Sequence, residues 1–525
     1  MKDCIRIARD FLSPAMPPTL LATTFALALT PGHLYLGIDA GTQSTKAVVY
    51  DASSRAVVGR GAVSYGLLPT EVVGRAEQDP AEWVEAMFEA CRQALDASEG
   101  SRDRVRAIGV SGQQHGLVAL DEKFEVIRPA KLWCDLESAP EAAEISRGLD
   151  VPIVASFTAS KLLWLKRNEP DSWARLAHVA LPHDYLNYLL TGSLVMEGSD
   201  ASGTGFLDTS ARKWDAAAAA LVDDGMLAKL PPLIGPGEWA GALQPSAAAR
   251  LGLGASGVRV AAGGGDNAMS ALGSGCATIG RVAVSLGTSG TVFGKSAAAA
   301  RDPSGVVCPF LDATGGGLPL VCTVNCAQPP EEVVAASGGL TRDEVARLAA
   351  AEPPGCDGVS FLPYLAGERT PNWPHASGVL AGLRMGHLAR RGLLYRAAIE
   401  GATFSLRAGY DVMRAHGMPD YDSLGEVRLV GGGARSTLWR QTVADAFGAR
   451  VACPAEPESA ALGAALQAAA VDAGAGDAIG EWIAERHDPP VAEVVEPTAE
   501  GTAALEEAFA LYSERASAMF AGGGG

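Results

Sequence analysis

Leu36-Gly-Ile-Asp-Ala-Gly-Thr-Gln-Ser-Thr45 and Val282-Ala-Val-Ser-Leu-Gly-Thr-Ser-Gly-Thr291 can be laid over each other without a gap. Each stretch begins as an apolar strand, passes through a Gly-Thr turn and enters a second strand. The two copies lie far apart in the chain, and each stands near the start of a series of strand-like and helix-like segments. We therefore predict a duplicated α/β fold with a cleft between the copies, where a ligand can bind and closure can exclude water.

The segments around these two stretches define the predicted domains. A chain of 525 residues is longer than one hydrophobic core usually serves, so we expect two domains. The first covers residues 33–255 and includes a helix over Pro80–Ser98, where apolar residues recur at helical spacing. The second covers residues 256–485 and opens with the strand Val258–Ala262.

The two ends of the chain lie outside these domains. Residues 1–32 contain basic residues followed by a short apolar run, Leu20–Leu29, which is similar to the pattern of a secretory signal. The run contains threonine and a good cleavage region is lacking, so we expect a disordered or non-native extension. Within residues 486–525 we predict an amphipathic helix, Thr502–Phe520, followed by a disordered glycine tail.

Composition and charge restrict the classes of function. A hydrophobic share of 48% with 19% charged residues is typical of a folded soluble protein. The net charge of −18 argues against a nucleic-acid or anionic-membrane surface, which requires a basic face. No apolar stretch approaches the ~20 residues of a membrane span. The nine scattered cysteines predict reduced thiols and a cytoplasmic location. The oligomeric state stays open, with a homodimer as one option.

The turn in the first stretch has the residues of a phosphate and metal site. Gly41 allows close approach of the backbone, so successive amides and the hydroxyls of Thr42 and Ser44 can face phosphate oxygens. Asp39 at the strand end can hold Mg²⁺ through water, because this ion prefers oxygen ligands and keeps part of its hydration shell. An ordinary β-hairpin turn explains the same residues. Ser285 replaces Asp39 in the second copy, which favours a metal on one side only.

Two further glycine turns follow predicted strands. Gly263-Gly-Gly265 precedes Asp266, which either caps the helix that follows or directs its carboxylate at a substrate hydroxyl as a general base. Gly431-Gly-Gly433 allows a nucleotide to lie flat on the backbone, or is a tight turn between a strand and a helix. Gly252-Leu-Gly-Ala-Ser-Gly257 precedes a strand, so it is no dinucleotide fingerprint, and the chain contains no P-loop motif.

Taken together, these segments resemble the FGGY carbohydrate kinases. The resemblance runs from about Leu34 to Ala470 and rests on motifs that occur in the expected order. These motifs are Gly37-Ile-Asp-Ala-Gly-Thr-Gln-Ser-Thr-Lys46, Gly263-Gly-Gly-Asp-Asn-Ala268, Ser285-Leu-Gly-Thr-Ser-Gly290, Pro363-Tyr-Leu-Ala-Gly-Glu-Arg-Thr-Pro371 with Gly378-Val-Leu-Ala-Gly382, and Gly431-Gly-Gly-Ala-Arg435. The resemblance implies two RNase H-like domains of the actin/hexokinase-like ATPase fold around a central cleft.

Three stretches resemble those of family members that act on D-xylulose. They are Ser111-Gly-Gln-Gln-His-Gly-Leu-Val118, Leu181-Pro-His-Asp-Tyr-Leu-Asn-Tyr-Leu-Leu-Thr-Gly192 and Ser199-Asp-Ala-Ser-Gly-Thr204. Taken alone, His115 would be a turn or core histidine. Two positions depart from the family pattern: Gln114 replaces a common Met, and Glu137 stands where many relatives carry Arg. Both lie near the expected sugar pocket, so they bear on which sugar is bound.

The resemblance also implies a role for particular residues. Asp266 would deprotonate the terminal hydroxyl of the ketose, and Asp39 would act through Mg²⁺ as the metal-binding residue. The other site residues fall into two groups. The sugar would contact Asp266, Gln114, His115, Asn267, Trp133 and Asp135. The phosphates and the nucleoside of ATP would contact Thr42, Gln43, Ser44, Gly287, Thr288, Gly432 and Gly433.

The function that the resemblance implies is phosphorylation of D-xylulose to D-xylulose 5-phosphate by ATP. A kinase for another sugar or polyol, such as D-ribulose, L-fuculose or gluconate, is the nearest alternative. A non-catalytic or chaperone-like ATPase of the same fold is a remote one, since no separate peptide-binding domain is evident. A sugar-responsive repressor is disfavoured because no basic helix-turn-helix is visible.

Overall fold

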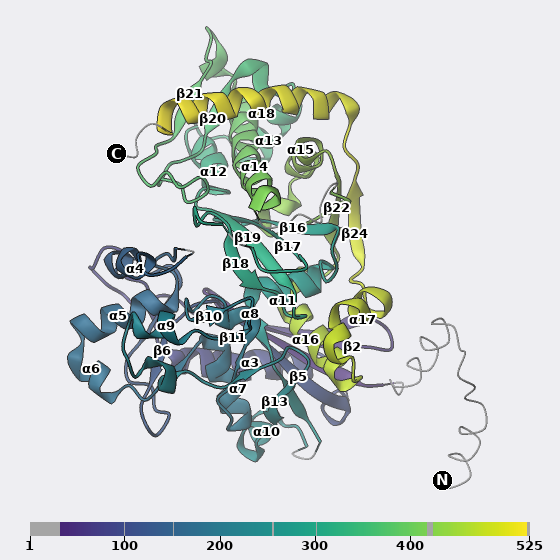
Figure 1. The fold of residues 1–525 in the computed structure, drawn as a ribbon. Helices are drawn as coiled ribbons and strands as arrows, with labels where there is room; N and C mark the ends of the chain where they lie inside the picture. The colour runs from purple at the N-terminus through teal and green to yellow at the C-terminus, as the bar shows by residue number, and fades with distance from the viewer. Residues whose placement is uncertain are drawn as a thin grey trace, which may run out of the picture.

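The first β-sheet is formed around the first of these two stretches (Figure 1). The computed structural model describes residues 32–98, 100–150, 152–254, 257–300, 302–416 and 424–521. Strand β1 (Leu34–Ala40) runs antiparallel to β2 (Ser44–Asp51) and parallel to β5 (Val105–Gly112). The sheet order is β13-β14-β5-β1-β2-β3, with β15 also paired to β5. The remaining strands are β3 (Ala56–Ser64), β13 (Trp239–Ala242), β14 (Arg259–Ala261) and β15 (Gly264–Gly265).

The second β-sheet repeats this arrangement around the second stretch. Strand β16 (Arg281–Leu286) runs antiparallel to β17 (Gly290–Gly294) and parallel to β22 (Glu426–Val430). The sheet order is β18-β19-β17-β16-β22-β23-β24. The remaining strands are β18 (Cys308–Leu311), β19 (Gly317–Thr323), β23 (Arg450–Pro454) and β24 (Val491–Val495). Each of β1 and β16 therefore has the next strand antiparallel on one side and a later strand parallel on the other. This repeated arrangement confirms the predicted duplicated α/β fold.

Helices pack against both sheets (Figure 1). The predicted helix over Pro80–Ser98 is present as α3 (Pro80–Asp96), which packs on β2 and β3. The longest helix, α14 (Arg391–His416), packs on the second sheet, and α18 (Ala499–Phe520) packs on α15. Other helices are α4 (Ala139–Ser146), α5 (Thr158–Asn168), α7 (Pro182–Thr191), α12 (Gln328–Ala335), α13 (Arg342–Ala350) and α15 (Thr437–Phe447). No helix in the described part of the chain is long and apolar enough to cross a lipid bilayer.

One strand lies in a different sheet from the predicted one. The segment Val258–Ala262 was expected to open the second domain, and that prediction is wrong. Its strand β14 pairs in parallel with β5, and β15 continues along the same edge. The first sheet therefore extends to Gly265, beyond the predicted boundary at residue 255. The reason is that β5 offers an open edge, which the buried Val260 and Ala261 cover.

The C-terminal segment also contributes to the second sheet. Strand β24 pairs antiparallel with β23 before the final helix begins. That helix starts three residues earlier than predicted, because the Thr498 side chain accepts a hydrogen bond from the Gly501 amide and caps it. The predicted extension over residues 1–32 and the predicted tail at Gly522–Gly525 fall almost entirely outside the described residues.

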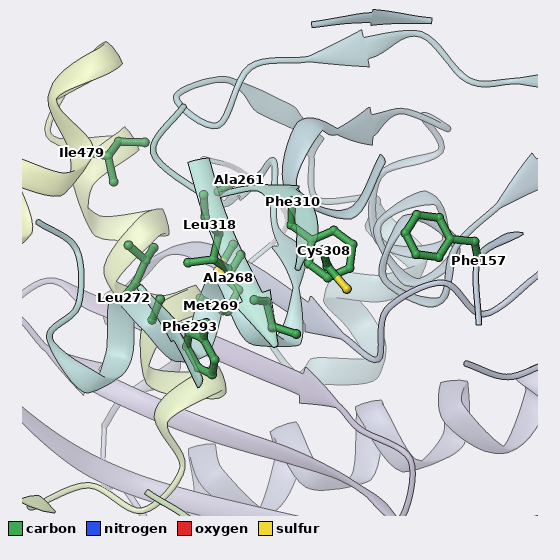
Figure 2. Close-up of a cluster of buried hydrophobic side chains, with 14 of the residues drawn as sticks. Phe157, Ala261, Ala268, Met269, Leu272, Phe293, Cys308, Phe310, Leu318 and Ile479 are labelled. Atoms are coloured by element: carbon green, nitrogen blue, oxygen red, sulfur yellow. The ribbon is translucent and has the colours of Figure 1, made fainter. Parts of the chain in front are cut away.

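Two crossed helices join the domains. Helix α11 (Asp266–Ser274) follows the first sheet, and α16 (Ser459–Asp472), from late in the chain, packs on β1 and β5. Figure 2 shows side chains of α11 within one buried cluster that also includes residues of the second sheet. The labelled members from α11 are Ala268, Met269 and Leu272, and those from the second sheet include Phe293 and Leu318. A single apolar cluster thus spans the junction between the domains.

Glycines allow α11 and α16 to approach closely. A Cβ atom on Gly463 would lie 1.8 Å from the carbonyl oxygen of Met269, and one on Gly273 would lie 1.8 Å from that of Ser459. Both contacts are with backbone, which cannot rotate away. The crossing therefore depends on the absence of a side chain at these two positions.

We expect Gly463→Ala to lower the free energy of unfolding by about 1–3 kcal/mol, because the added methyl group overpacks the helix crossing. Urea denaturation followed by circular dichroism measures the change. Gly66→Ala is the matched control, since a Cβ atom there meets nothing within 4 Å. Equal midpoints for the two variants would show that the crossing tolerates a side chain at residue 463.

Candidate active site

Two cavities adjoin at the β16–β17 turn. The smaller, which we name the inner cavity, has a volume of about 220 Å³ and receives residues from both domains. The larger, the outer cavity, has a volume of about 1100 Å³. Ser285 and Ser289 line the inner cavity, whereas Leu286, Gly287 and Thr288 line the outer one. A single turn, with the strand end before it, therefore lines both cavities.

The structure brings most of the predicted site residues to these cavities. The inner cavity is lined by six of the predicted residues, Thr42, Gln114, His115, Trp133, Asp266 and Asn267. The outer cavity is lined by four others, Gly287, Thr288, Gly432 and Gly433. Residues predicted for the sugar and residues predicted for the nucleotide are thus separated into adjoining spaces, with Thr42 on the sugar side.

Asp266 is the first residue of α11 and does not cap it. The N-cap residue is Gly265, which has no side chain. The Asp266 Oδ1 atom accepts hydrogen bonds from the backbone and the side-chain amides of Asn267, at 2.8 and 2.9 Å. Burial, followed by the negative charges of Asp39 and Asp200, raises the pKa of Asp266 to about 8. A carboxyl group with a raised pKa at a cavity wall can accept a proton from an alcohol.

Asp39 lies near the end of β1 and is not among the residues that line either cavity. Its Oδ1 accepts a hydrogen bond of 2.8 Å from Ser111 on the neighbouring strand β5. Burial raises the pKa of Asp39, while the Ser111 hydrogen bond and the charge of Lys46 oppose the shift. The carboxylates of Asp39 and Asp266 are close enough for one to raise the pKa of the other. Two carboxylates held near each other favour a cation between or beside them.

The first glycine turn is a β-hairpin whose polar groups are largely occupied. Gly41 closes the turn by donating its amide to the Ser44 carbonyl, at 3.0 Å. The Thr42 hydroxyl donates to Gln113 and accepts from the indole of Trp133, at 3.2 and 2.9 Å. Gln43 is exposed at the tip, and neither it nor Ser44 lines the two cavities. In this arrangement the Thr42 bond fixes Trp133, whose ring forms part of the inner wall.

The loop of Gln114 and His115 has the features of a binding site. His115 adopts the left-handed backbone conformation, with φ of 65°, which is uncommon for residues other than glycine. Its ring stacks on Phe157 at a centroid distance of 5.3 Å and lies near Phe310 at 5.2 Å. Burial, with the charges of Lys161 and Arg369, holds the pKa of His115 well below its usual range. The imidazole is therefore neutral and can both donate to and accept from a hydroxyl.

Gln114, which also lines the inner cavity, has a donor without a partner. Its Oε1 accepts a hydrogen bond of 2.8 Å from Asn267, but its buried Nε2 has no partner among the described residues. A buried amide donor without a partner costs free energy unless a ligand supplies an acceptor. The Gln114–Asn267 bond also ties this loop to the start of α11, next to Asp266.

Asp135 does not line the inner cavity, and the prediction that it contacts the substrate is not supported by its position. It is fully buried, and its Oδ2 accepts from Lys131 and from the Ala76 amide, both at 2.9 Å. Glu137, which replaces a common Arg, pairs with the same Lys131 at 2.6 Å and with Arg75 at 2.8 Å. Both carboxylates therefore belong to a buried ion-pair network behind the cavity wall, because Lys131 needs their negative charges there.

The third glycine turn lies at the outer cavity. Gly431 has φ of 89°, and a Cβ atom there would meet the Leu286 carbonyl oxygen at 2.7 Å, so only glycine fits. Gly432 is open, since a Cβ atom there would meet nothing within 4 Å. Arginines that also line this cavity are Arg342, Arg347, Arg396 and Arg435. Glu331 and Asp343 line it as well, and Arg342 pairs with Glu331 and Arg396 with Glu400. Arg347 and Arg435 form no ion pair among the described residues, and their charges fit an anionic ligand.

Several residues of the inner cavity were not predicted. They include Ser156, Cys308, Phe310, Cys322 and Arg369. The position of Ser156 is fixed by Lys161, which donates to the carbonyls of residues 155, 156 and 157 from the first turn of α5. Arg369 lies in the family-like stretch Pro363–Pro371, so its charge was a usable signal. Nothing in the local sequence marks Ser156 or the two thiols.

The two sheets and the cavity between them define a two-domain α/β fold of the actin/hexokinase-like ATPase class, with one cavity on either side of one turn. Residues 34–273 match the N-terminal domain and residues 282–471 the C-terminal domain of the FGGY family of carbohydrate kinases. The chain belongs to this family. The first match ends in the last turn of α11, consistent with the position of β14 in the first sheet.

Individual relatives match almost the whole chain. A xylulose kinase from Streptomyces rubiginosus is 39% identical over 95% of this chain and 100% of its own length. A xylulose kinase from Haemophilus influenzae is 38% identical over 83% of this chain and 90% of its own length. The crystal structure of a xyloylose kinase from Brucella ovis superposes with a TM-score of 0.83 at 34% identity, covering 93% of this chain and 99% of that one.

Proposed function

We propose that this protein transfers the γ-phosphoryl group of ATP to O5 of D-xylulose, giving D-xylulose 5-phosphate. The observation that carries the proposal is Asp266, a carboxyl group of raised pKa in a cavity of about 220 Å³ that meets the larger cavity at one turn. A small polyhydroxylated substrate fits the inner cavity, and a nucleotide fits the outer one. The similarity to xylulose kinases over most of the chain supports the choice of sugar.

In this proposal Asp266 orients the terminal hydroxyl of the sugar and accepts its proton. Phosphoryl transfer passes through a loose transition state, so the base acts mainly by positioning the alcohol and takes the proton late. Neutral His115 and the free amide donor of Gln114 bind sugar oxygens at the same cavity wall. The amides of Gly287 and Thr288 face the phosphates from the turn between the cavities. Closure of the domains about the α11–α16 crossing keeps water from accepting the phosphoryl group.

The carboxylate of Asp39 fits a magnesium ion. It is an oxygen donor close enough to Asp266, a residue of the inner cavity wall, to raise the pKa of that group, and its Oδ1 accepts one hydrogen bond, from Ser111. Asp39 would hold Mg²⁺ through water, and the ion would neutralise charge on the transferred phosphate. Its counterpart Ser285 carries no charge, so the metal belongs to one side of the cleft.

ADP release with a panel of sugars tests the function. Purified protein with MgATP is expected to form ADP at the highest kcat/KM with D-xylulose, compared with D-ribulose, L-fuculose, gluconate and glycerol. Phosphorus NMR of the product then identifies the phosphorylated oxygen. A preference of tenfold or more for another sugar would overturn the assignment of D-xylulose but not that of a sugar kinase, and no sugar-dependent ADP release would overturn both.

We expect His115→Ala to lower kcat/KM for D-xylulose by about 10- to 100-fold, because the site loses a neutral donor and acceptor and each lost partner costs about 1–3 kcal/mol. Slow ATP hydrolysis without sugar should persist, since the phosphates are bound elsewhere. His115→Asn is the control, because asparagine tolerates the left-handed backbone. An equal loss of kcat/KM in both variants would show that the His115 imidazole, and not the backbone conformation, is responsible. Loss of sugar-independent hydrolysis would mean that the loop is structural.

A further inference from the structure

Arg369 places an unpaired positive charge at the wall of the inner cavity. Its Nη2 donates to the thiol of Cys308 at 3.0 Å, and a thiol sulfur is a weak acceptor. Its buried Nε has no hydrogen-bond partner among the described residues. A guanidinium has five donors in a rigid planar fork, so most of its capacity is left for a ligand.

The neighbouring carboxylate of Glu368 forms no ion pair with the Arg369 side chain. Glu368 is buried, and its Oε1 accepts from the amides of Val324, Arg369 and Thr370. Its Oε2 accepts from the Asn325 side chain at 3.1 Å. Glu368 therefore organises the backbone of two loops, and in doing so it directs the Arg369 side chain toward the cavity. No ion pair joins Arg369 to a carboxylate within the described ranges of the chain.

The neighbours of Arg369 show which wall of the inner cavity it belongs to. Cys308 and Phe310 lie on strand β18, with Phe157 opposite them (Figure 2). His115 lies between Phe157 and Phe310, and the charge of Arg369 contributes to the low pKa of this histidine. Arg369 and His115 thus share one wall. Because Asp266 lines the same cavity, a five-carbon chain with its O5 at Asp266 can extend its carbonyl end toward that wall.

We propose that Arg369 is a substrate-binding residue that donates hydrogen bonds to O1 and the carbonyl oxygen O2 of the bound ketose. This inference rests on the function proposed above and specifies which end of the sugar the arginine recognises. Two adjacent oxygens match the planar fork of a guanidinium, whereas a lysine presents a single point charge. The ligand oxygens satisfy donors that the protein leaves without partners.

The test compares Arg369→Met and Arg369→Lys with wild type, using D-xylulose and 1-deoxy-D-xylulose, which lacks O1. Arg369→Met is expected to lower kcat/KM for D-xylulose by about 10- to 100-fold, mostly through KM. For 1-deoxy-D-xylulose the loss should be at most a third as large, because one of the two contacts is already missing. Arg369→Lys should recover part of the loss. Arg384→Met, at an exposed arginine outside both cavities, is the matched control and should behave as wild type.

Thermal denaturation separates this role from a structural one. Without sugar, Arg369→Met should melt at the wild-type temperature or above it, because an uncompensated buried charge is removed, but D-xylulose should raise its melting temperature less than that of wild type. An unchanged KM, an equal loss with both substrates, or a melting temperature lowered by several degrees without sugar would each overturn the proposal. If wild type prefers another sugar, the D-xylulose assignment fails, and the KM of Arg369→Met for that sugar decides the role of Arg369.

Discussion

Asp266→Asn is expected to lower kcat by about 10²–10⁴-fold while the protein still folds and binds ATP. The amide of asparagine keeps the size of the side chain and can still accept from the Asn267 backbone, as Asp266 does at 2.8 Å. What it loses is the ability to take the proton of the sugar hydroxyl. Steady-state kinetics with D-xylulose measure kcat, and calorimetric titration with ATP measures nucleotide binding. A variant that retains more than about a third of wild-type kcat would show that Asp266 is not the base.

The effect of Asp266→Asn on the stability of the folded protein should depend on pH. The folded-state pKa of Asp266, about 8, is above its unfolded value, so the folded protein binds this proton more tightly than the unfolded chain. The tighter binding of this proton stabilises the folded protein. The stabilisation is fully present below the pKa that Asp266 has in the unfolded chain, and it is lost as the pH rises to about 8. Asparagine does not titrate. The melting temperature of Asp266→Asn relative to wild type, measured without ligands, should therefore rise from pH 5 to pH 8 and then level off.

Asp39→Ala is expected to raise the Mg²⁺ concentration needed for half-maximal rate and to lower kcat by about 10-fold or more, because a carboxylate that holds the ion through water is removed. Titration of the rate with MgCl₂ at saturating ATP and D-xylulose measures both effects. Ser285→Ala is the matched control at the counterpart position in the second sheet, and its Mg²⁺ dependence should equal that of wild type. An unchanged magnesium dependence in Asp39→Ala would exclude Asp39 as the metal-binding residue.

Local sequence was sufficient to predict where single turns follow the strands. The Gly-Thr turns at residues 41 and 287, the glycine turn at 431 and the start of α11 at Asp266 each combine a strand with the glycine that follows it. At residue 431 the backbone has φ of 89°, a local conformation that favours glycine. The repeated strand–turn–strand pattern likewise predicted the duplicated fold.

The features that the sequence did not predict depend on contacts between distant segments. Strand β14 pairs with β5 because β5 has an open edge. The sequence near residue 258 contains no signal for this pairing. Asp135 follows Trp133, which does line the cavity, but Lys131 and the Ala76 amide hold the carboxylate behind the wall. Arg369 reaches the cavity because Glu368 is occupied by backbone amides of a loop more than forty residues earlier in the chain. These partners come together only in the folded chain, so local sequence does not predict them.

The packing of α16 on the first sheet has a consequence for how the protein is made. Gly37 and Gly109 face this helix so closely that a Cβ atom on either would lie within 2.0 Å of a carbonyl oxygen of Ala461 or Ala464. Strand β5 leaves the ribosome about 360 residues before the end of α16, an interval of roughly 20–70 s at typical rates of translation. During that interval one face of the nascent sheet lacks its cover, and its apolar side chains are available to chaperones or to other unfinished chains. A ribosome that stalls before residue 459 therefore releases an N-terminal half that has every strand of its sheet and still cannot complete its core.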